Sequence, residues 1–231
     1  MERRRVLLLG ATGLVGSELL PLLLGSSDPR GCPGTREPGH PGNRGAEDPR
    51  VIVLARRTTG IQHPRLEEHL FDLAQMEQHA DAFRDVDTIF CALGTTMRVA
   101  GSEERFRFVD HELPLTAARL GLSHGAQHYL LVSSLGANAQ SRVFYNRVKG
   151  EVERDLAALP YRSITIVRPS FLLGERKELR VGEQIVTRLR FLMPPRIKPI
   201  DAKIVARALL ALSKQKEPGV RIVESRELRS L

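Results

Sequence analysis

A tyrosine and a lysine four positions apart could together transfer a proton in this chain. Tyr145 and Lys149 fall in a segment with a helical pattern, where residues four apart share one face. Free tyrosine has a pKa of about 10 and is a poor acid at neutral pH. A lysine ammonium ~5 Å away, at an effective dielectric of about 20, favours the phenolate by roughly 3 kcal/mol, which is about two pKa units. Such a phenol is better matched to giving a proton to a carbonyl oxygen as hydride arrives.

Two serines precede this pair and could hold the substrate oxygen. Ser133 and Ser134 follow an apolar run that predicts a strand, and Ser134 is the first choice and Ser133 the second. The Tyr-x-x-x-Lys pattern is common by chance, so the alternative is that Tyr145 packs in the core and Lys149 is a surface charge. The order along the chain, with a glycine turn and paired arginines ahead of the serines, favours chemistry.

A glycine-rich turn near the start of the sequence is suited to binding phosphate. Residues 10–16, GATGLVG, join an apolar run to a helical pattern. Gly10, Gly13 and Gly16 let the backbone approach a pyrophosphate, and the N-terminus of the following helix offers free N–H groups and a positive dipole end. The spacing is Gly-x-x-Gly-x-x-Gly rather than the more familiar Gly-x-Gly-x-x-Gly, and a plain glycine turn is the alternative.

The residues after the second predicted strand indicate which nicotinamide cofactor is bound. NAD-specific folds carry an acidic residue there, which binds the ribose 2′-hydroxyl. In this sequence Arg56 and Arg57 occupy the position, and guanidinium groups suit a 2′-phosphate. We therefore expect NADP(H) rather than NAD(H), with a solvated arginine pair as the alternative. Asp72 could meet the adenine edge or cap the helix that follows it.

Strands that alternate with helices must position these groups. The alternation predicts an α/β fold with a doubly wound parallel sheet. We expect one NAD(P)-binding Rossmann-like domain over 1–231, with a Pro/Gly-rich flexible insertion at 29–49 and a small substrate-side region at 171–200. Pro114 marks a kink or a new first turn in its helix. The expected strands are 5–9, 51–55, 69–71, 88–91, 129–132, 164–167 and 220–223, and the expected helices are 14–24, 102–121, 144–159 and 204–212.

Composition and charge argue against several other classes of function. The 231 residues carry a formal net charge of +8, but the basic residues are spread along the chain, so we do not expect nucleic-acid binding. No apolar run reaches the length of a membrane span. The two cysteines allow neither a disulfide framework nor a zinc site, and we expect no metal site among the seven histidines. These features predict a cytoplasmic protein in a reducing compartment.

The whole pattern resembles the short-chain dehydrogenase/reductase superfamily, and most closely the atypical branch of the human Tat-interacting protein and its bacterial relatives. The Cys-x-Leu-Gly-Thr-Thr stretch at 91–96 and the Val-Lys-Gly-Glu-Val-Glu run at 148–153 are specific to that branch. The resemblance covers nearly the whole chain except the Pro/Gly-rich insertion. The residues that carry it are 10–16, 54–57, 91–96, 100–101, 109–110, 128–136, 145–152 and 168–169.

The resemblance implies a Rossmann-like fold that binds NADPH, and it assigns contacts along the cofactor. The pyrophosphate is bound by the turn, the adenosine phosphate by the arginines, and the nicotinamide ribose by the Tyr–Lys pair. The implied contacts, in chain order, are Thr12, Gly13, Leu14, Val15, Arg56, Arg57, Leu93, Gly94, Tyr145, Lys149, Leu172 and Arg180.

Two functions remain open on these residues. The first is an NADPH-dependent reductase of a small-molecule carbonyl substrate, in which Tyr145 donates the proton, Lys149 tunes it and anchors the ribose, and Ser134 holds the oxygen. The second is a non-catalytic NADPH-binding sensor or adaptor that regulates a protein partner. Fold alone does not decide between them. The retained Ser, Tyr and Lys favour the first, and either protein would be a monomer or a homodimer.

Overall fold

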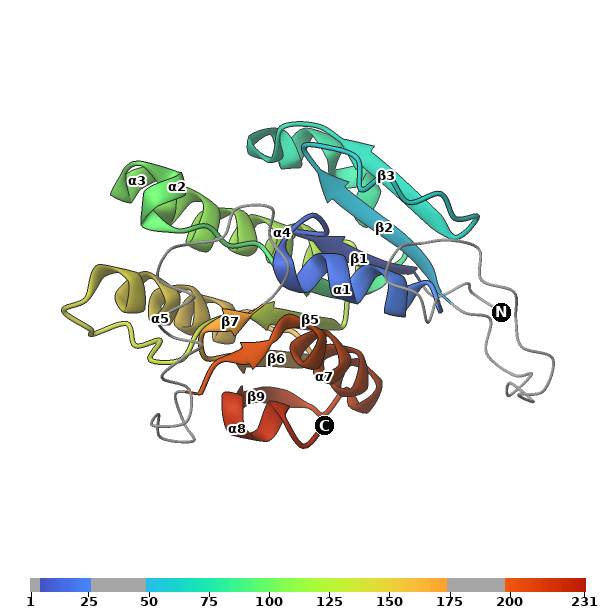
Figure 1. Cartoon of the computed structure of the whole chain (residues 1–231). Coiled ribbons are helices and arrows are strands. Elements are labelled where there is room, and N and C mark those ends of the chain that lie inside the picture. Colours follow the sequence, from blue (N-terminus) through green and yellow to red (C-terminus); the bar gives the residue numbers. More distant parts are fainter. Residues whose placement is uncertain (1–4, 26–48, 174–197) are drawn as a thin grey trace.

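A parallel sheet forms the centre of the molecule. The computed structural model describes residues 5–25, 49–173 and 198–231. Seven strands lie in the order β3-β2-β1-β4-β5-β6-β9, every neighbouring pair is parallel, and helices cover both faces (Figure 1). The chain starts near the middle of the sheet and runs outward to each side in turn, which is the doubly wound arrangement. The predicted α/β fold with a parallel sheet is confirmed.

The strands and helices alternate along the chain much as expected. The strands of the main sheet are β1 (Arg5–Leu9), β2 (Arg50–Ala55), β3 (Leu66–Leu70), β4 (Val86–Cys91), β5 (His128–Val132), β6 (Ser163–Arg168) and β9 (Gly219–Glu224), and a separate parallel pair is formed by β7 (Leu172–Leu173) and β8 (Ile200–Asp201). The helices are α1 (Leu14–Leu23), the 3-10 segment η1 (Leu73–Phe83), α2 (Met97–Ala100), α3 (Glu103–Arg107), the π turn η2 (Phe108–Glu112), α4 (Leu113–Ser123), α5 (Phe144–Ala157), α7 (Ala202–Gln215) and α8 (Ser225–Leu228).

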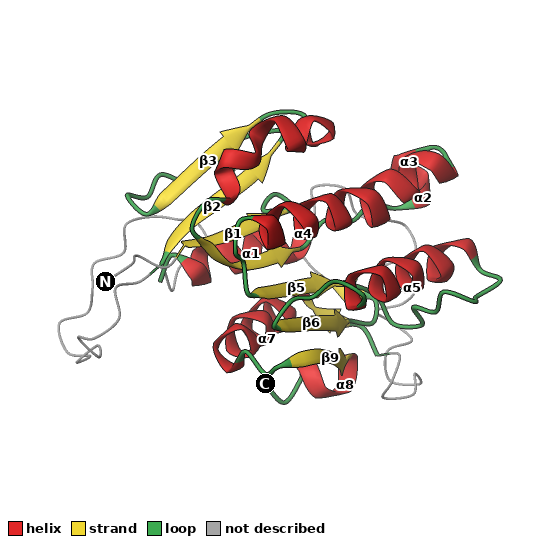
Figure 2. Ribbon diagram, turned by 180° about the vertical axis from the view of Figure 1, so that it is seen from behind, coloured by secondary structure: helices red, strands yellow, loops and turns green. Residues whose placement is uncertain are grey.

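Helices cover both faces of the sheet because its central strands carry apolar side chains on both sides. In β1, Leu8 packs into a core with α1 and α7, whereas Leu7 packs into a second core with η1, α4 and α5. Successive strand residues point to opposite faces, so an uninterrupted apolar run serves both cores. Figure 2 shows α4 and α5 side by side over the second of these faces.

Strand β3 differs most from its prediction. The sequence predicted a weak strand at 69–71, but the strand runs from Leu66 to Leu70. Among the described strands it is the edge of the sheet and pairs with β2 alone, and its side chains are half-buried or exposed. Glu67 contacts Arg5 at 3.1 Å, and Glu68 accepts from the backbone N–H of Thr59 at 2.8 Å. A prediction based on apolar runs misplaced this strand because it contains these polar residues.

The helix predicted over 102–121 contains a π turn in its middle. Helix α3, the π turn and α4 follow one another without leaving the right-handed helical backbone conformation. Pro114 explains the widened turn, because in an α-helix its ring would clash with the carbonyl group of Asp110, four positions earlier. The predicted kink therefore takes the form of a π turn, which carries the buried Asp110, 1% exposed, on its inner side.

Buried polar groups gather where β5 and β6 begin, at the opposite end of the sheet from the glycine turn. His128 is fully buried, and its Nε2 lies 3.1 Å from the hydroxyl oxygen of Thr165. Lys216 and Asp87 form an ion pair close to it. Burial and the charge of Lys216 lower the pKa of His128 to about 4, against smaller opposing contributions from Asp87 and the backbone of Ser213. His128 is therefore a neutral, buried imidazole at pH 7.

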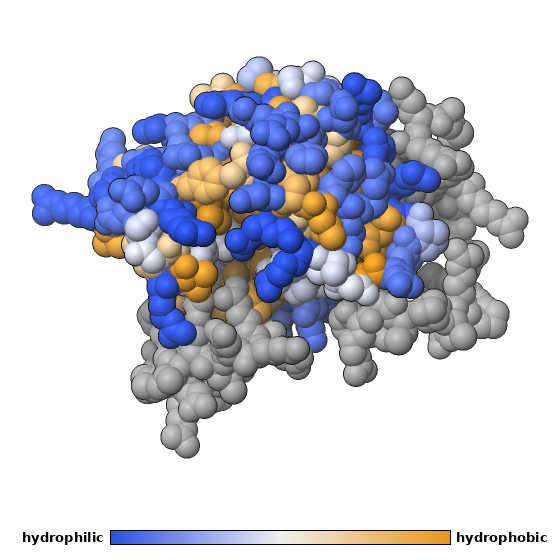
Figure 3. All heavy atoms as spheres, turned by 90° about the horizontal axis from the view of Figure 1, so that it is seen from above, coloured by the Kyte–Doolittle hydropathy of each residue, from blue (hydrophilic) through white to orange (hydrophobic). Residues whose placement is uncertain are grey.

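The surface is mainly hydrophilic on the face that Figure 3 shows, with small apolar areas between the polar ones. Among the described residues, the most exposed large apolar side chains are Val99, Phe171 and Val143. They follow β4, β6 and β5 respectively, so all three belong to segments at the carboxyl end of the sheet. No helix within the described ranges is long and apolar enough to cross a membrane.

Candidate cofactor and active site

The glycine turn joins the end of β1 to the start of α1. Gly10 has a φ of +82°, and a Cβ there would overlap the backbone carbonyl of Ala92, which follows β4. A Cβ at Gly16 would overlap the carbonyl of Gly10 itself. The backbone N–H of Gly13 donates to that same carbonyl at 2.9 Å. Gly10 and Gly16 are thus required by close backbone packing, whether or not a ligand is bound.

Gly13 is different, because it occupies the N-cap of α1. It supplies no capping side chain, and the first turn of α1 contains no acidic residue. The first N–H groups of a helix lack partners within the helix, and its dipole is positive at this end. Thr12 beside it is exposed, Leu14 is half-buried and Val15 is buried. The turn therefore presents an uncapped helix N-terminus, which suits an anionic group such as a pyrophosphate.

The segment after β4 lies beside the glycine turn. The backbone N–H of Ala92 donates to the carbonyl of Leu9 at 2.9 Å, which holds the two strand ends together. Leu93 is half-buried and Gly94 is exposed. A Cβ added at Gly94 would lie 3.9 Å from Nζ of Lys149. The structure thus brings Lys149 of the helix next to Gly94, which follows the end of β4.

Helix α5 carries the Tyr–Lys pair in its first two turns. Tyr145 is half-buried, and its ring centroid lies 5.5 Å from that of Phe106 in α3. Lys149 is only 4% exposed. The alternative interpretation of Lys149 as a solvated surface charge is therefore wrong.

A buried carboxylate that the sequence analysis did not assign a role faces Lys149. Oδ1 of Asp110 lies 2.8 Å from Nζ of Lys149, and Oδ2 accepts from the backbone N–H of Thr95 at 2.8 Å. Burial disfavours the charged form of Lys149, but the Asp110 carboxylate and Tyr145 outweigh it, so the pKa of Lys149 is raised. Charged and polar residues surround Asp110 in the sequence, so its burial could not be inferred from the apolar pattern.

An ion pair and a histidine–carboxylate contact also fasten α5 to the helix that carries Asp110. Arg107 contacts Glu151 at 2.6 Å, and Nε2 of His111 lies 2.8 Å from a carboxylate oxygen of Asp155. Arg154 and His111 lower the pKa of the Asp155 carboxyl despite its partial burial. Together with the Lys149 pair, these contacts hold α5 in one position relative to α3 and α4.

The two serines have different surroundings. Ser133 is 5% exposed, and its hydroxyl donates to Oε1 of Glu153. Nε of Arg168 donates to both carboxylate oxygens of Glu153, at 3.0 and 3.2 Å. The hydrogen bond to this carboxylate is the largest of the effects that raise the pKa of Arg168. Ser134 is half-buried, and among the described residues its hydroxyl donates to the carbonyl of Leu135, at 3.4 Å. The hydroxyl of Ser133 is thus bound to a buried carboxylate, whereas the hydroxyl of Ser134 is the more accessible of the two to a ligand.

The paired arginines lie exposed directly after β2. Because Leu54 of β2 pairs with Leu9 of β1, Arg56 and Arg57 lie at the same end of the sheet as the glycine turn. Within the described residues, neither guanidinium forms an ion pair. Asp72 follows β3, and its side chain accepts from the backbone N–H of Ala74 at 3.1 Å as the N-cap of η1. Of the two roles predicted for Asp72, a contact with the adenine edge or a helix cap, the structure shows the cap.

The predicted substrate-side region is only partly described. Leu172 is half-buried in β7 and pairs with β8. Arg180 lies outside the described residues, as do most of 171–200 and all but residue 49 of the Pro/Gly-rich insertion at 29–49.

A separate hollow of about 440 Å³ lies between α5, β6 and β9. Its lining includes Val220 and Ile222, which are 47% and 44% exposed, together with Glu153 and Arg168. Neither the glycine turn nor the Tyr–Lys pair contributes to it. We therefore do not assign the cofactor or the chemistry to this hollow.

Comparison with known proteins identifies relatives of the whole chain. No family model matches it. The rat protein HTATIP2 is 32% identical over 186 residues, which cover 79% of this chain and 69% of the rat protein. The mitochondrial protein FMP52-1 of Scheffersomyces stipitis is 33% identical over 239 residues, which cover 96% of each chain.

Solved structures share the fold at low sequence identity. MoeE5 in complex with UDP-glucose and NAD has a TM-score of 0.67 and 16% identity, and the match covers 98% of this chain and 80% of MoeE5. The UDP-N-acetylglucosamine 4-epimerase of Methanobrevibacter ruminantium M1 also has a TM-score of 0.67, at 15% identity, and covers 97% of this chain and 77% of the epimerase. Identity this low shows the common fold and nothing about the substrate.

The predicted cytoplasmic location is contradicted by the relatives. Six of them are FMP52 proteins named as mitochondrial. The prediction rested on few cysteines and on the absence of a long apolar run, and neither feature separates the cytoplasm from another reducing compartment.

Because relatives of this identity align over more than two thirds of their own length, the chain belongs to the family of HTATIP2 and FMP52, NAD(P)-binding proteins of the atypical short-chain dehydrogenase/reductase type.

Proposed function

We propose that this chain binds NADP(H) and reduces a carbonyl compound by hydride transfer. The observation that carries the proposal is the position of Lys149, buried against Gly94 at the carboxyl end of β4. Open α/β sheets bind dinucleotides outside the carboxyl ends of their strands, where the strand order reverses. In this sheet the reversal lies between β1 and β4, which are the strands that end at the glycine turn and at Gly94.

The residues at this end of the sheet fit a dinucleotide phosphate. The uncapped N-terminus of α1 would hold the pyrophosphate through backbone N–H groups. Arg56 and Arg57, exposed beside it, would hold the 2′-phosphate, and planar guanidinium groups suit that contact. Leu93 and Leu172 would line the path toward the nicotinamide, as the family pattern implies.

The proposed chemistry needs one proton at the substrate oxygen. NADPH, when bound, supplies the hydride that attacks the carbonyl carbon. The hydroxyl of Tyr145 donates its proton to the carbonyl oxygen as negative charge develops there, and the hydroxyl of Ser134 donates a hydrogen bond to the same oxygen. The products are the alcohol and NADP⁺, and Tyr145 regains its proton from water. Lys149 would bind the ribose and keep the hydroxyl of Tyr145 in position next to it.

The apolar side chains at this end favour a substrate with an apolar portion. Val99, Val143 and Phe171 are 71%, 58% and 63% exposed, and they follow the three strands nearest to the proposed chemistry. At the proposed site these side chains would contact the apolar portion of the substrate. The mitochondrial names of six relatives favour the same compartment for this chain.

Titration with NADPH and with NADH tests the cofactor preference. We expect tighter binding of NADPH in the wild type, and a ten- to hundredfold loss of NADPH affinity in Arg56→Asp, because a charge-assisted hydrogen bond contributes about 1.5–3 kcal/mol. The affinity for NADH should change little. Isothermal titration calorimetry of the full chain gives all four dissociation constants.

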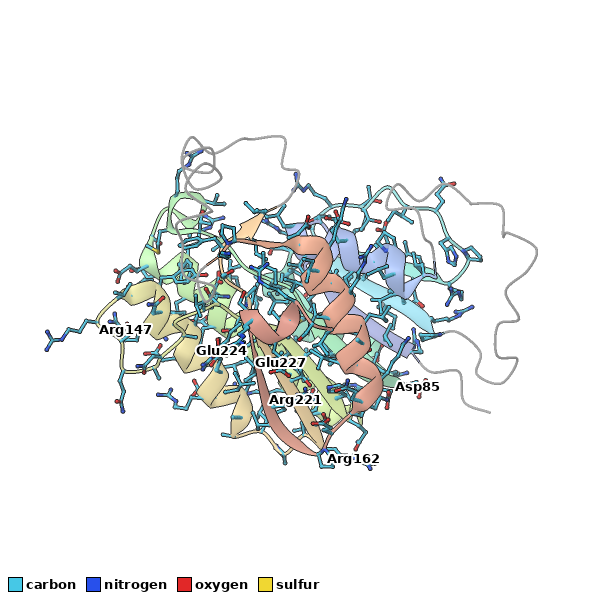
Figure 4. All side chains as sticks on the ribbon, turned by 60° about the horizontal axis from the view of Figure 1, so that its bottom comes forward. Asp85, Arg147, Arg162, Arg221, Glu224 and Glu227 are labelled. Atoms are coloured by element: carbon cyan, nitrogen blue, oxygen red, sulfur yellow. The ribbon has the colours of Figure 1, made fainter. Side chains whose placement is uncertain are left out.

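A matched variant controls for the change of charge. Arg162, labelled in Figure 4, is exposed just before β6, at the opposite end of the sheet. Arg162→Asp makes the same charge change and should leave both affinities unaltered. Equal affinities of the wild type for the two cofactors would refute the preference. NADPH binding without oxidation by any member of a carbonyl panel would favour the sensor or adaptor over the reductase.

A further inference from the structure

The loop that carries the paired arginines is bound to the edge strand by one carboxylate. This arginine loop, residues 56–65, joins β2 to β3. Oε2 of Glu68 accepts from the hydroxyl of Thr58 at 2.7 Å, and Oε1 accepts from the backbone N–H and the hydroxyl of Thr59 at 2.8 and 2.5 Å. Both oxygens of Glu68 therefore bind the two residues that follow Arg57.

The two threonines also hold the residues that come after them in the arginine loop. The hydroxyl oxygen of Thr58 accepts from the backbone N–H of Gly60 at 3.0 Å, and that of Thr59 accepts from the backbone N–H of Ile61 at 3.3 Å. Such bonds from a hydroxyl to its own backbone two positions on stabilise turns. Ile61 packs against the core that contains α1. The loop is thus held in one conformation by contacts that involve no ligand.

Glu68 lies on the face of the sheet that α1 covers. Leu66, two positions earlier in β3, packs against the core with α1, and residues two apart in a strand share one face. Glu68 pairs with Val53, two residues before β2 ends at Ala55. Figure 1 shows β3 as the outer strand beside β2. The carboxylate is therefore close to the carboxyl end of β2, where Arg56 and Arg57 follow.

The contacts of Glu68 keep it ionised without involving the arginines. Burial alone would raise the pKa of the Glu68 carboxyl, but the hydrogen bonds from Thr59 and Thr58 outweigh it, so the pKa is lowered. An ionised acceptor forms stronger hydrogen bonds than a neutral one. In the described part of the chain, these bonds come from threonine donors and from neither guanidinium. Arg56 and Arg57 therefore keep their positive charge for an anionic ligand.

We propose that Glu68 is a positioning residue, which orders the arginine loop so that Arg56 and Arg57 bind the 2′-phosphate of NADP(H). The inference rests on the proposed cofactor preference and adds to it a residue on which that preference depends. An ordered loop binds its ligand more tightly than a flexible one, because less conformational entropy is lost on binding. NADH lacks the 2′-phosphate, so its affinity should depend little on this order.

Glu68→Ala removes both acceptor oxygens and should release the arginine loop. In the protein without cofactor, we expect the backbone amide of Thr59 to exchange with solvent about tenfold faster, as followed by NMR. Calorimetry of the full chain should show NADPH binding weakened roughly tenfold and NADH binding changed by less than about twofold. The ratio of the two dissociation constants is the decisive readout, because a general loss of stability would affect both cofactors alike.

Two matched variants separate positioning from charge. Glu67→Ala removes the neighbouring carboxylate of β3, which contacts Arg5 and His69 rather than the arginine loop, and should leave both affinities unaltered. Glu68→Gln removes the charge but keeps one oxygen that accepts from Thr59, so it should keep most of the preference for NADPH. Loss of a negative charge by itself favours binding of a phosphate. Tighter NADPH binding by Glu68→Ala would therefore overturn the proposal.

The same measurements distinguish failure of this inference from failure of the proposed function. If the wild type prefers NADPH and Glu68→Ala keeps that preference, the inference is wrong and the proposed function stands. An equal loss of affinity for both cofactors would show a purely structural role of Glu68 and would also overturn the inference. If the wild type binds NADPH and NADH equally, the proposed cofactor preference fails and the inference fails with it.

The double variant Thr58→Val/Thr59→Val covers the case in which Glu68→Ala does not fold. It removes both hydroxyl donors from the arginine loop and leaves β3 unchanged. We expect NADPH binding to weaken about threefold, because the backbone N–H of Thr59 still reaches Glu68, with NADH binding unchanged. Unchanged NADPH binding in this variant would contradict the assigned role.

Discussion

The buried imidazole of His128 predicts a loss of stability in mildly acidic solution. Its pKa is about 4 in the folded chain, whereas the unfolded value is 6.5. Between these values the unfolded state binds the proton and the folded state does not. The stability contributed by neutral His128 is therefore fully present above pH 6.5, and it is lost as the pH falls toward 4.

The expected loss is large compared with the stability of a typical domain. Each pH unit inside the window costs about 1.4 kcal/mol, so a fall from pH 7 to pH 5 should remove roughly 2 kcal/mol of the free energy of unfolding. Domains of this kind are stable by about 5–15 kcal/mol in total. Carboxyl groups with lowered pKa values, such as Glu67 and Asp155, lose their contributions mainly at lower pH, because their unfolded values are 4.5 and 3.8.

Urea unfolding at pH 7, 6 and 5, followed by circular dichroism, measures this loss. His128→Gln removes the titrating group and should flatten the dependence over this interval, although the variant itself will be less stable. His79→Gln is the control, because His79 stacks on Phe71 at 3.8 Å, far along the chain from β5, and its replacement should keep the slope. If His128→Gln loses as much stability as the wild type between pH 7 and 5, the reasoning is wrong.

Two pairs of variants separate folding from function at the candidate site. Gly16→Ala should cost about 3 kcal/mol of unfolding free energy, since its methyl group overlaps the Gly10 carbonyl, whereas a Cβ at Gly13 would lie 3.2 Å from that oxygen. Gly13→Ala should therefore cost only about 1 kcal/mol in urea unfolding but weaken NADPH binding at least roughly tenfold by calorimetry. Ser134→Ala should lower kcat by about a hundredfold with unchanged NADPH affinity, and Ser133→Ala should instead cost about 2 kcal/mol of stability. The reverse pattern in either pair would contradict the assigned roles.

The central strands could be predicted because burial on both faces leaves a continuous apolar run. The predicted bounds of the strand at 5–9 match the observed ones. The predicted bounds of the strands at 51–55 and 88–91 lie within two residues of those observed. The edge strand β3 was misplaced because its side chains pair with polar neighbours instead of a core. Short elements such as α2 and α8 have four residues each, too few for a periodic signal, and their ends depend on tertiary contacts.

The candidate site could be predicted where residue type alone carries the chemistry. Glycines, paired arginines and a Tyr–Lys spacing are visible in sequence, and the structure brings Lys149 next to Gly94. The partner of Lys149 was not visible, because Asp110 is 39 residues earlier in the chain and reaches it only through helix packing. The commitment of Ser133 to Glu153 was hidden for the same reason. NADP(H) preference and catalytic roles remain predictions.

The π turn at Phe108–Glu112 has a consequence for how this protein could have diverged. A π turn holds one residue more than an α turn, so the loss of a single codon there, together with replacement of Pro114, would restore an ordinary helix. Every side chain before the deletion would then rotate by about 100° relative to α4. A lineage with that deletion could keep its sheet and its glycine loop while the carboxylate swung away from the lysine. Two changes within this one helix would thus alter the chemistry of the site and leave the scaffold intact.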